Sequence, residues 1–291
     1  MHWANKTLSY AGKPQLINSA IFGLNNFWGA SVLLPKGISK KIRKLCKDFL
    51  WGIEDGSRRH VFMCWQLLCT PKVEGGMGIK EVLSWNSAQM TKWVWKLLFK
   101  PGCLWSRWVT QYILKGGGGD IWEAQSSISH SWYWNNVIKM KDLLLELSGG
   151  PEQALALLVR CTSRLRFDVS LIYELIRPRS SVVPWASLVY DKGCHPKHSF
   201  IGMLALHDKL PSIDKLISRG IMLVNRCSLC LRQCENITHL FFNCEFSAQV
   251  WGIVAARLHL QGGTFDLHDT IYALLMARRN SLHNAGFLAT I

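Results

Sequence analysis

Four residues in the last quarter of the chain have the types and the spacing of a structural zinc site. They follow the pattern Cys-x2-Cys-x8-His-x4-Cys and are Cys227, Cys230, His239 and Cys244. Two cysteines separated by two residues let one tight turn present both sulfurs to a single ion, and structural zinc takes four such ligands in a tetrahedron. The pattern therefore predicts one Zn²⁺ ion. Because four protein ligands leave no position for water, the ion would hold structure and would not catalyse hydrolysis.

Other cysteines and histidines could replace one of these ligands, and they are Cys194, His195, His198 and Cys234. Cys234 falls between the two ligand pairs, where it would be a fifth ligand. The two additional histidines are distant in the sequence and a proline separates them. The sequence alone leaves open whether one of them substitutes, and it leaves open a set of reduced thiols in a core.

Short helices are expected on both sides of the ligands. The apolar residues of the segment after Cys244 recur at helical spacing, which places Cys244 near a helix N-terminus, where partial positive charge favours a thiolate. They are Phe246, Val250, Ile253, Val254 and Leu258. Before the cluster, "PSIDKLISRG" predicts a short helix with Ser212 as its N-cap and Gly220 at its end. The polar stretch "LRQCENIT" between the pairs cannot form a core by itself, so folding here is expected to depend on the metal.

The residues before the zinc pattern also have helical periodicity. Met90, Trp93 and Leu97 mark one helix, which "KPG" ends because proline cannot continue it. An earlier amphipathic helix has an apolar row formed by Ile38, Ile42, Leu45 and Phe49. Another face of that helix is basic and carries Lys40, Arg43, Lys44 and Lys47. Such a face can bind phosphates without reading base sequence, so these four are the candidate nucleic-acid contacts.

The fold class predicted is mainly α, a helical N-terminal region followed by a small zinc-stabilised module with short helices and a knuckle turn. Twelve of the fourteen tryptophans lie at or before Trp134, and the breaks "KGGGGD" and "RPRSSVVPW" interrupt the chain. We therefore expect a helical region over 1–115, a linker and helical segment over 116–184, the zinc-binding domain over 185–251 and a helical tail over 252–291.

The composition favours a polyanionic partner. The 34 Lys and Arg residues outnumber the 19 Asp and Glu residues and give a formal charge of +15, while 49% hydrophobic content argues for a folded core. No secretory signal is visible, which predicts an intracellular protein with reduced cysteines. The apolar stretch "LINSAIFGLNNFWGASVLL" is interrupted by asparagines and glycines, so it indicates a buried helix and no membrane span.

The segment from Trp185 to Trp251 resembles the zinc-binding domain of reverse transcriptases in plant LINE-type, non-LTR retrotransposons. The resemblance rests on "PKHSF", "LALHDKLPSIDKL", the Cys-x2-Cys pair and "THLFFNC". Upstream, "FGLNNFWGASVLLPKGISKKIRKLCKDFLWG" and "PKVEGGMGIKEVLSWNSAQMTKWVWKLL" resemble the region that follows the polymerase palm. The resemblance implies nucleic-acid binding, with RNA favoured, in the nucleus. It also implies a second possibility, an interaction scaffold that packs on a polymerase domain or another protein in trans.

Catalysis is not expected from these residues. A reverse transcriptase palm holds two Mg²⁺ ions on carboxylates, usually from paired aspartates, and the sequence contains no Asp-Asp pair. Asp191, Asp266 and Asp269 do not stand in the sequence context of such a pair. No Walker lysine loop, Gly-x-Ser-x-Gly elbow or His-Glu-x-x-His motif is present. The sequence thus predicts a non-catalytic remnant of a retrotransposon reverse transcriptase.

Overall fold

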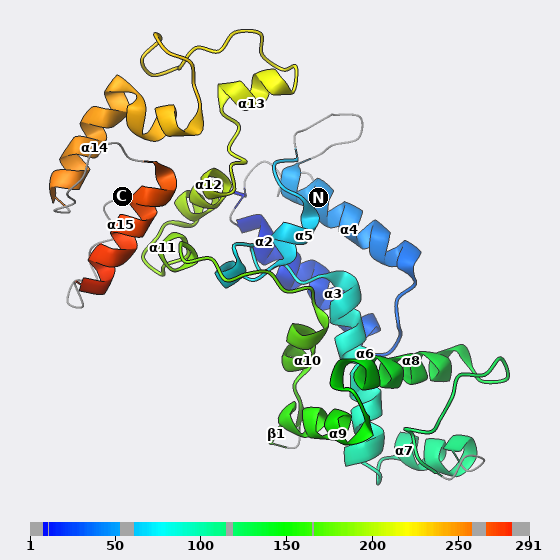
Figure 1. Cartoon of the computed structure of the whole chain (residues 1–291). Coiled ribbons are helices and arrows are strands. Elements are labelled where there is room, and N and C mark those ends of the chain that lie inside the picture. The colour runs from blue at the N-terminus through cyan, green and yellow to red at the C-terminus, as the bar shows by residue number, and fades with distance from the viewer. Residues whose placement is uncertain are drawn as a thin grey trace. The chain divides into compact units, whose positions relative to one another are not determined.

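The computed structural model describes residues 8–10, 12–52, 61–114, 119–164, 166–257 and 266–280, and this part is mostly helical, as predicted (Figure 1). Its helices are α2 (Gly12–Leu16), α3 (Phe22–Gly29), α4 (Lys36–Trp51), α5 (Trp65–Cys69), α6 (Val82–Phe99), α7 (Leu104–Trp108), α8 (Trp132–Ser148), α9 (Pro151–Arg160), α10 (Val169–Ile176), α11 (Ala186–Val189), α12 (Pro196–Leu206), α13 (Ile213–Ser218), α14 (Glu245–Arg257) and α15 (Leu267–Asn280). Shorter turns are η1 (Ile17–Ile21), η2 (Lys72–Glu74), η3 (Val109–Ile113) and η5 (His239–Asn243).

One small hairpin completes the secondary structure of the described residues. Strand β1 (Thr162–Ser163) pairs antiparallel with β2 (Arg166–Phe167), with Thr162 opposite Phe167 and Ser163 opposite Arg166. The Trp95 indole donates to the Thr162 hydroxyl over 2.8 Å. This hydrogen bond attaches the hairpin to α6.

The chain forms two compact units, and each is made from separate stretches of sequence. One unit comprises residues 1–15, 49–79 and 180–291, and it contains the four predicted zinc ligands. The other comprises residues 16–48 and 80–179. The division into four consecutive segments stays a prediction.

Helix α6 is the central element of the unit formed by residues 16–48 and 80–179. It packs against α3, α8 and α10. Its buried side chains include Val82, Ala88, Met90 and Val94, and α8 contributes Val137, Ile138 and Leu144 to the same core. The helix ends at Phe99, immediately before Lys100-Pro101, as the proline predicted.

A buried asparagine joins α6 to the end of α3. The Asn86 side chain is fully buried, and its amide nitrogen donates to the carbonyls of Gly29 (2.8 Å) and Val32 (2.9 Å). Its amide oxygen accepts from the Leu34 N–H over 2.7 Å. A Cβ on Gly29 would lie 2.5 Å from a Gln89 side-chain oxygen, so a larger residue there would require the Gln89 side chain to move. One side chain thus satisfies three backbone groups where a helix ends.

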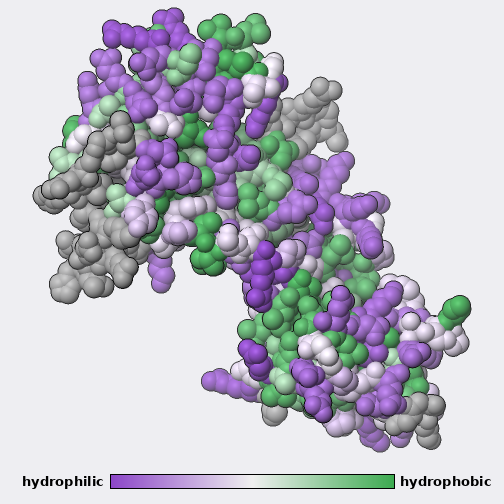
Figure 2. Space-filling model, viewed as in Figure 1, coloured by the Kyte–Doolittle hydropathy of each residue, from purple (hydrophilic) through white to green (hydrophobic). Residues whose placement is uncertain are grey.

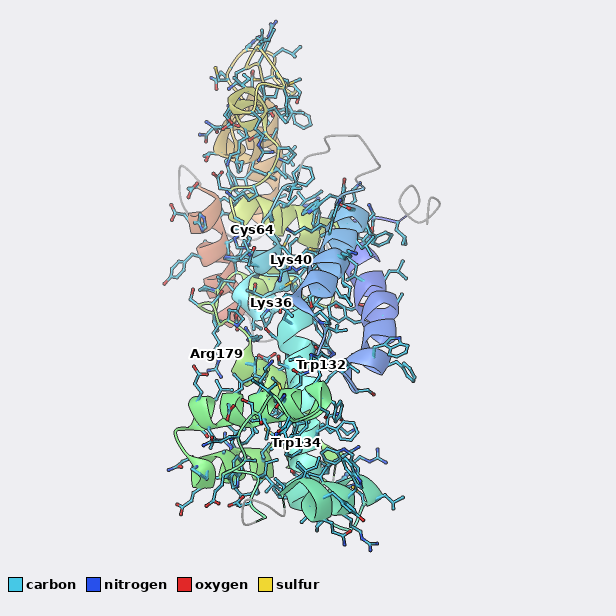
Figure 3. All side chains as sticks on the ribbon, turned by 90° about the vertical axis from the view of Figure 1, so that its right-hand side faces the viewer. Lys36, Lys40, Cys64, Trp132, Trp134 and Arg179 are labelled. Atoms are coloured by element: carbon cyan, nitrogen blue, oxygen red, sulfur yellow. The ribbon has the colours of Figure 1, made fainter. Side chains whose placement is uncertain are left out.

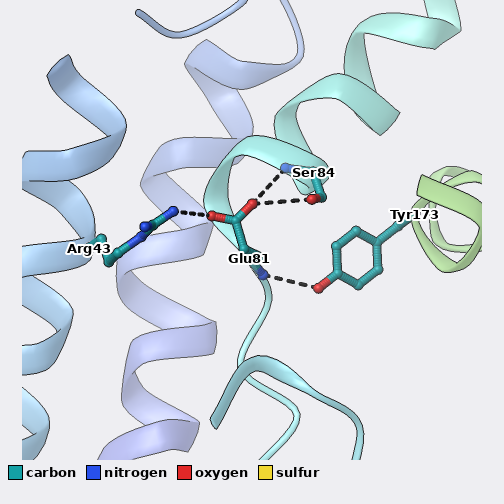
Figure 4. A network of polar contacts seen from close by, with 4 residues as sticks. All are labelled: Arg43, Glu81, Ser84 and Tyr173. Carbon is teal, nitrogen blue, oxygen red and sulfur yellow. Dashed lines mark hydrogen bonds and ion pairs between the residues drawn. The ribbon is translucent and has the colours of Figure 1, made fainter. Parts of the chain in front are cut away.

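An ion pair and a helix cap are combined at the start of α6 (Figure 4). The Arg43 guanidinium lies 2.8 Å from one carboxylate oxygen of Glu81. The other carboxylate oxygen accepts from the Ser84 N–H (2.8 Å) and hydroxyl (3.2 Å), which caps the helix. The Glu81 N–H donates to the Tyr173 hydroxyl over 3.0 Å. Arg43 is therefore engaged inside the protein.

The buried face of α4 differs from the predicted one. Ile38 (46% exposed) and Leu45 (62% exposed) face solvent, and Ile42 is half-buried. The buried positions are Ser39, Cys46, Phe49, Leu50 and Trp51, so Phe49 alone of the predicted row is buried. Ser39, Cys46 and Leu50 each lie one residue after a member of the predicted row, because a cysteine and a serine occupy inward sites that a search for large apolar residues overlooks.

The stretch 16–34 is largely helical, but it is not the buried helix that we predicted. Ile17 and Phe22 are buried, whereas Phe27 (73% exposed) and Trp28 (64% exposed) are on the surface. Hydrophobic residues reach the surface of both units elsewhere as well (Figure 2). Among the residues that the structure describes, no helix combines the length and the apolar character needed to cross a bilayer.

Aromatic rings form the core of the unit that contains the zinc ligands. The Tyr10 ring stacks on Phe200 with centroids 5.3 Å apart, and Trp51 meets Phe62 edge-on at 5.2 Å. Trp185 packs edge-on against His207 at 5.3 Å, and the His207 ring nitrogen lies 2.9 Å from the Gly75 carbonyl oxygen. These contacts anchor α11 and α12, which precede α13 and the zinc ligands in the sequence.

Candidate metal centre

The structure brings together the four residues of the Cys-x2-Cys-x8-His-x4-Cys pattern. Their ligand atoms all lie within 4.8 Å of one another, and no other such group of metal-binding side chains occurs among the described residues. The Cys227 and Cys244 sulfurs are 3.9 Å apart, and the Cys230 sulfur lies 3.5 Å from His239 Nε2. Three of the four residues are buried, and Cys230 is half-buried.

The two distances of 3.9 Å and 3.5 Å match a tetrahedral zinc site. Zn–S bonds of ~2.3 Å and a Zn–N bond of ~2.05 Å, arranged tetrahedrally, place two sulfurs ~3.8 Å apart and a sulfur and a nitrogen ~3.5 Å apart. A disulfide would require about 2.05 Å between sulfurs, so the 3.9 Å between Cys227 and Cys244 is no disulfide. The three cysteines form no disulfide, and three sulfurs with one imidazole are a donor set that zinc prefers.

The first ligand pair sits on a compact loop that its own backbone closes. The Cys227 N–H donates to the Gln233 carbonyl over 2.8 Å, and the Leu231 N–H donates to the Cys227 carbonyl over 2.9 Å. The Asn225 side chain bridges the loop, because its oxygen accepts from the Glu235 N–H (2.6 Å) and its nitrogen donates to the Glu235 carbonyl (3.3 Å). This closure holds Cys227 and Cys230 on the same side of the loop.

Backbone N–H groups around the loop favour the metal-binding form of Cys230. The N–H groups of Arg232 and Gln233 donate to its sulfur and lower the pKa of the thiol to about 6. The His239 side chain acts in the same direction. Burial raises the pKa of the Cys227 thiol, and the N–H groups of Cys230 and Leu229 oppose that rise. Because a thiolate is the ligand, Cys230 is ready to bind a cation near neutral pH.

The second ligand pair is placed by a short helical turn and by α14. The Asn236 side chain accepts from the His239 N–H over 2.7 Å, and the turn η5 then carries the chain from His239 to Asn243. The Cys244 carbonyl accepts from the Ala248 N–H over 2.7 Å, so Cys244 immediately precedes α14. The expected position of Cys244 at a helix N-terminus is confirmed.

The sequence analysis missed a buried carboxylate that joins the loop to α13. Glu235 is 5% exposed, and its two oxygens accept from the Ile213 N–H (3.1 Å) and from the Ser228 N–H and hydroxyl (3.3 Å each). A buried carboxylate needs such partners. The only signal in the sequence was a single glutamate in a polar loop, which does not distinguish a buried anchor from a solvated side chain. Helix α13 does begin after Ser212, as predicted.

The alternative ligands lie outside the cluster. Cys234 is exposed, although it is close in sequence to Cys230. His195 accepts from the Lys197 N–H over 3.3 Å and caps α12, and its ring lies 5.3 Å from that of His198. The Cys194 sulfur is 3.9 Å from the His195 carbonyl oxygen. The structure thus groups Cys194, His195 and His198 around the start of α12.

Leu231, in the ligand loop, has a backbone conformation that is unfavourable for any residue with a side chain, and this leads to a stability prediction. Leu231 has φ of +56° and is 55% exposed. A left-handed conformation costs an L-residue about 1–2 kcal/mol, whereas glycine adopts it freely. We expect Leu231→Gly to raise the free energy of unfolding of the zinc-loaded protein by up to ~1 kcal/mol, after the entropy of the added glycine is subtracted.

The matched control is Leu229→Gly in the same turn. Leu229 is 45% exposed and has no positive φ, so the same change should lower the free energy of unfolding. Thermal unfolding at fixed zinc concentration measures both variants. Equal destabilisation by the two substitutions would contradict the strain at Leu231.

The candidate basic contacts do not share one environment. Lys40 and Lys44 are exposed, Lys47 is half-buried, and Arg43 pairs with Glu81. Lys36 and Lys41 are also exposed on α4, and Figure 3 labels Lys36 and Lys40. Helix α4 therefore presents lysines to solvent, and its arginine serves the network at the start of α6.

Comparison with known proteins agrees with this geometry. Residues 167–251 match the family described as zinc-binding in reverse transcriptase, and all four cluster residues lie inside the match. A protein of Arabidopsis thaliana named "Putative ribonuclease H protein" is 29% identical over 152 residues, which cover 45% of this chain and 24% of that protein. An "Uncharacterized mitochondrial protein" of the same plant is 25% identical over 112 residues, which cover 38% of this chain and 71% of that protein.

The chain thus spans about a quarter of the first relative and more than two thirds of the second. The cluster geometry and the family match support one structural zinc ion. The resemblance identified from the sequence is confirmed for one segment: residues 167–251 are similar to the zinc-binding segment of reverse transcriptases.

Proposed function

We propose that this region binds nucleic acid, RNA in preference, and that its zinc site serves to fold one of the binding modules. The ligands in this proposal are Cys227, Cys230, His239 and Cys244. The observation that carries the binding proposal is the solvent-exposed lysine face of α4. Six basic residues and one acidic residue lie on this helix of sixteen residues.

The exposed lysines of α4 suit phosphate binding. Lys40 and Lys44 lie one helical turn apart, and no ion pair to either occurs within the described part of the chain. Like charges one turn apart on a helix destabilise it slightly, by about 0.2–0.5 kcal/mol per pair. A polyanion would relieve this repulsion and release its own counterions. Lys47 extends the same face towards the end of the helix.

Arg43 is separated from the lysines in this proposal. Its ion pair with the Glu81 carboxylate supports the cap of α6, so its replacement is expected to weaken the fold and to leave phosphate binding to the lysines. A single variant Arg43→Gln therefore tests stability, and the lysine variants test binding. Unfolding experiments measure the loss of stability in Arg43→Gln, and RNA titrations measure the loss of binding in the lysine variants, so the two effects can be separated.

The binding test replaces Lys40, Lys44 and Lys47 with glutamine. We expect weaker binding to every single-stranded RNA sequence tested, because phosphate contacts carry no base information. The slope of log K against log salt should flatten by ~2, at roughly 0.7 per contact for single strands. The measurement is fluorescence anisotropy of a labelled oligouridylate titrated at four salt concentrations.

The control has the same change in net charge elsewhere. Lys192, Lys197 and Lys209 are exposed residues of the other unit, and their replacement with glutamine should change the slope much less. An unchanged slope in the α4 variant would assign that face to solvent. Equal losses in both variants would indicate attraction to net charge alone.

A scaffold role is the second candidate, and exposed apolar side chains on α14 favour it. Phe246, Val250 and Ile253 are 57%, 48% and 62% exposed and recur along one face of the helix. Such a face would suit a protein partner, for example a polymerase domain in trans. Absence of RNA binding at low salt would favour this role. For the nucleic-acid-binding role and for the scaffold role alike, we propose that the chain has no polymerase activity. An intracellular, nuclear location stays a prediction.

A further inference from the structure

Helix α6 carries a second row of lysines, which the sequence analysis did not consider. Lys92 and Lys96 lie four residues apart on the same side of the helix, and Lys100 directly follows its last residue, Phe99. The pKa of Lys96 is lowered, first by burial and then by the positive charge of Lys92, with a smaller contribution from Lys100. The Lys96 ammonium is thus close enough to Lys92 and to Lys100 to be repelled by both.

No carboxylate in the neighbouring sequence balances this charge. The stretch from residue 82 to 119 contains no aspartate or glutamate, although it includes four lysines and Arg107. Throughout the described ranges, none of the three α6 lysines forms an ion pair. Repulsion along a helix face lowers stability, so such a row points to an anionic ligand from outside the chain.

Aromatic rings lie directly beneath and beside these lysines. The Lys96 ammonium is 3.9 Å from the centroid of the Trp93 ring, and the Trp93 indole donates to the Ala30 carbonyl over 2.9 Å. The Trp93 ring also meets Trp105 at 4.8 Å and Tyr133 at 5.8 Å, both edge-on. Packing and a hydrogen bond therefore fix this ring under the charge. Lysine ammonium groups held over aromatic rings are oriented before any ligand arrives.

The helical turn that follows α6 exposes further aromatic rings. Trp108 is 53% exposed and Tyr112 is 73% exposed, and their ring centroids are 6.3 Å apart at an interplanar angle of 34°. This segment is attached to α6, because the Ser106 hydroxyl donates to the Lys96 carbonyl over 3.1 Å. Trp132, at the start of α8, is 55% exposed, whereas Trp134 is buried (Figure 3). The structure thus attaches a segment with large exposed rings to the end of the helix that carries the lysines, and bases and phosphates can use such rings and charges together.

We propose that this lysine–tryptophan face, formed by Lys92, Lys96, Lys100, Trp108 and Tyr112, binds single-stranded nucleic acid. The lysines contact phosphates, and the two exposed rings stack on unpaired bases. A duplex would offer the phosphates but not the bases, because paired bases are stacked inside the helix. The proposal deepens the proposed function, since it adds a second surface to α4 and specifies a single strand as its ligand.

The experiment uses the full chain loaded with zinc and two probes, a labelled oligouridylate of 20 nucleotides and a 20-base-pair RNA duplex. Replacement of Lys92, Lys96 and Lys100 with glutamine should flatten the salt slope for the single strand by ~2, at roughly 0.7 per phosphate contact. Replacement of Trp108 and Tyr112 with leucine should weaken single-strand binding by about 5- to 150-fold per ring and leave the salt slope unchanged.

The control for the ring variant is Trp28→Leu, an exposed tryptophan on α3 that is 64% exposed. It should leave the affinity for both probes unchanged. Thermal melting of every variant shows that the fold is retained, since all the replaced rings are exposed. A second readout is quenching of tryptophan emission by the single strand, which the Trp108 and Tyr112 variant should lose in part.

The outcomes separate this inference from the proposed function. If RNA binding depends on α4 but neither face variant changes it, the lysine–tryptophan face is overturned and the proposed function stands. If the face variants weaken binding and the α4 variant does not, the face is supported and the α4 assignment fails. If the protein binds the single strand and the duplex with equal affinity, and the ring variant does not change this affinity, the lysines attract phosphates without base stacking. This result would overturn the inference. Absence of binding to either probe at low salt overturns both and favours a protein partner.

Discussion

Removal of zinc is expected to unfold the segment from α13 to α14 and to leave the unit of residues 16–48 and 80–179 folded. The ligand atoms of Cys227, Cys230, His239 and Cys244 converge within 4.8 Å, and three thiolates without a cation would repel one another. The loop between the pairs is polar, so little apolar burial remains to hold it. Zinc contributes folding free energy on the order of 10 kcal/mol in the most favourable peptide cases.

The variant Cys230→Ser tests this directly, and Cys234→Ser is its matched control. Both remove one thiol from the same loop, but only Cys230 belongs to the cluster, while Cys234 is exposed. Elemental analysis of protein purified without chelator should give about one zinc per chain for the wild type and for Cys234→Ser. It should give much less for Cys230→Ser.

Loss of structure on chelation can be followed at Trp251 on α14. Its ring packs edge-on against Phe242 with centroids 5.5 Å apart, so unfolding of η5 should change its emission. Because the chain has fourteen tryptophans, the signal is the difference between the wild type and Trp251→Phe. Negligible zinc in the wild type, with helical circular dichroism unchanged by chelator, would show that these residues are core thiols.

Replacement of Asn86 with leucine is expected to destabilise its unit more than other buried substitutions of similar size. The change leaves the Gly29 and Val32 carbonyls and the Leu34 N–H without their partner. A buried polar group that loses its partner costs about 1–3 kcal/mol, so three groups give a loss of roughly 3–6 kcal/mol after partial relaxation. This is a large fraction of the about 5–15 kcal/mol by which typical proteins are stable.

Asn136→Leu is the matched control for this prediction. Asn136 is 2% exposed on α8, but within the described residues its amide nitrogen has no partner and its oxygen has only a 3.5 Å contact with Lys139. The same substitution should therefore be nearly neutral or stabilising there. Urea unfolding monitored by circular dichroism compares the two variants. A similar loss in both would mean that volume, and not the three hydrogen bonds, determines the effect at Asn86.

The zinc cluster was predictable from the sequence because its ligands are close together along the chain. Eighteen residues contain all four, and a two-residue interval between Cys227 and Cys230 forces their sulfurs to the same side of one turn. Helical periodicity after Cys244 similarly predicted α14, since its spacing is a local property. The mainly α fold class followed from the same local patterns, and it is confirmed.

The supports of the cluster were not predictable, because they act between separate segments. Glu235 is buried only because α13 and the ligand loop meet on its carboxylate. The polarity of a single residue does not reveal such a partner. Asn86 is a similar case, since its three partners lie more than fifty residues earlier in the chain.

The faces of α4 show where local reasoning ends. The sequence correctly predicted an amphipathic helix there, but it chose Ile38 and Leu45 as inward residues, and the structure exposes both. It also grouped Arg43 with the lysines, although a glutamate 38 residues away engages its guanidinium. Helical periodicity and ligand spacing are properties of one segment, so the sequence by itself determined most of the helices and the group of side chains that we propose as metal ligands. Which helix face is buried, and which charge is paired inside the protein, depends on the neighbouring segment, and only the tertiary structure decided it.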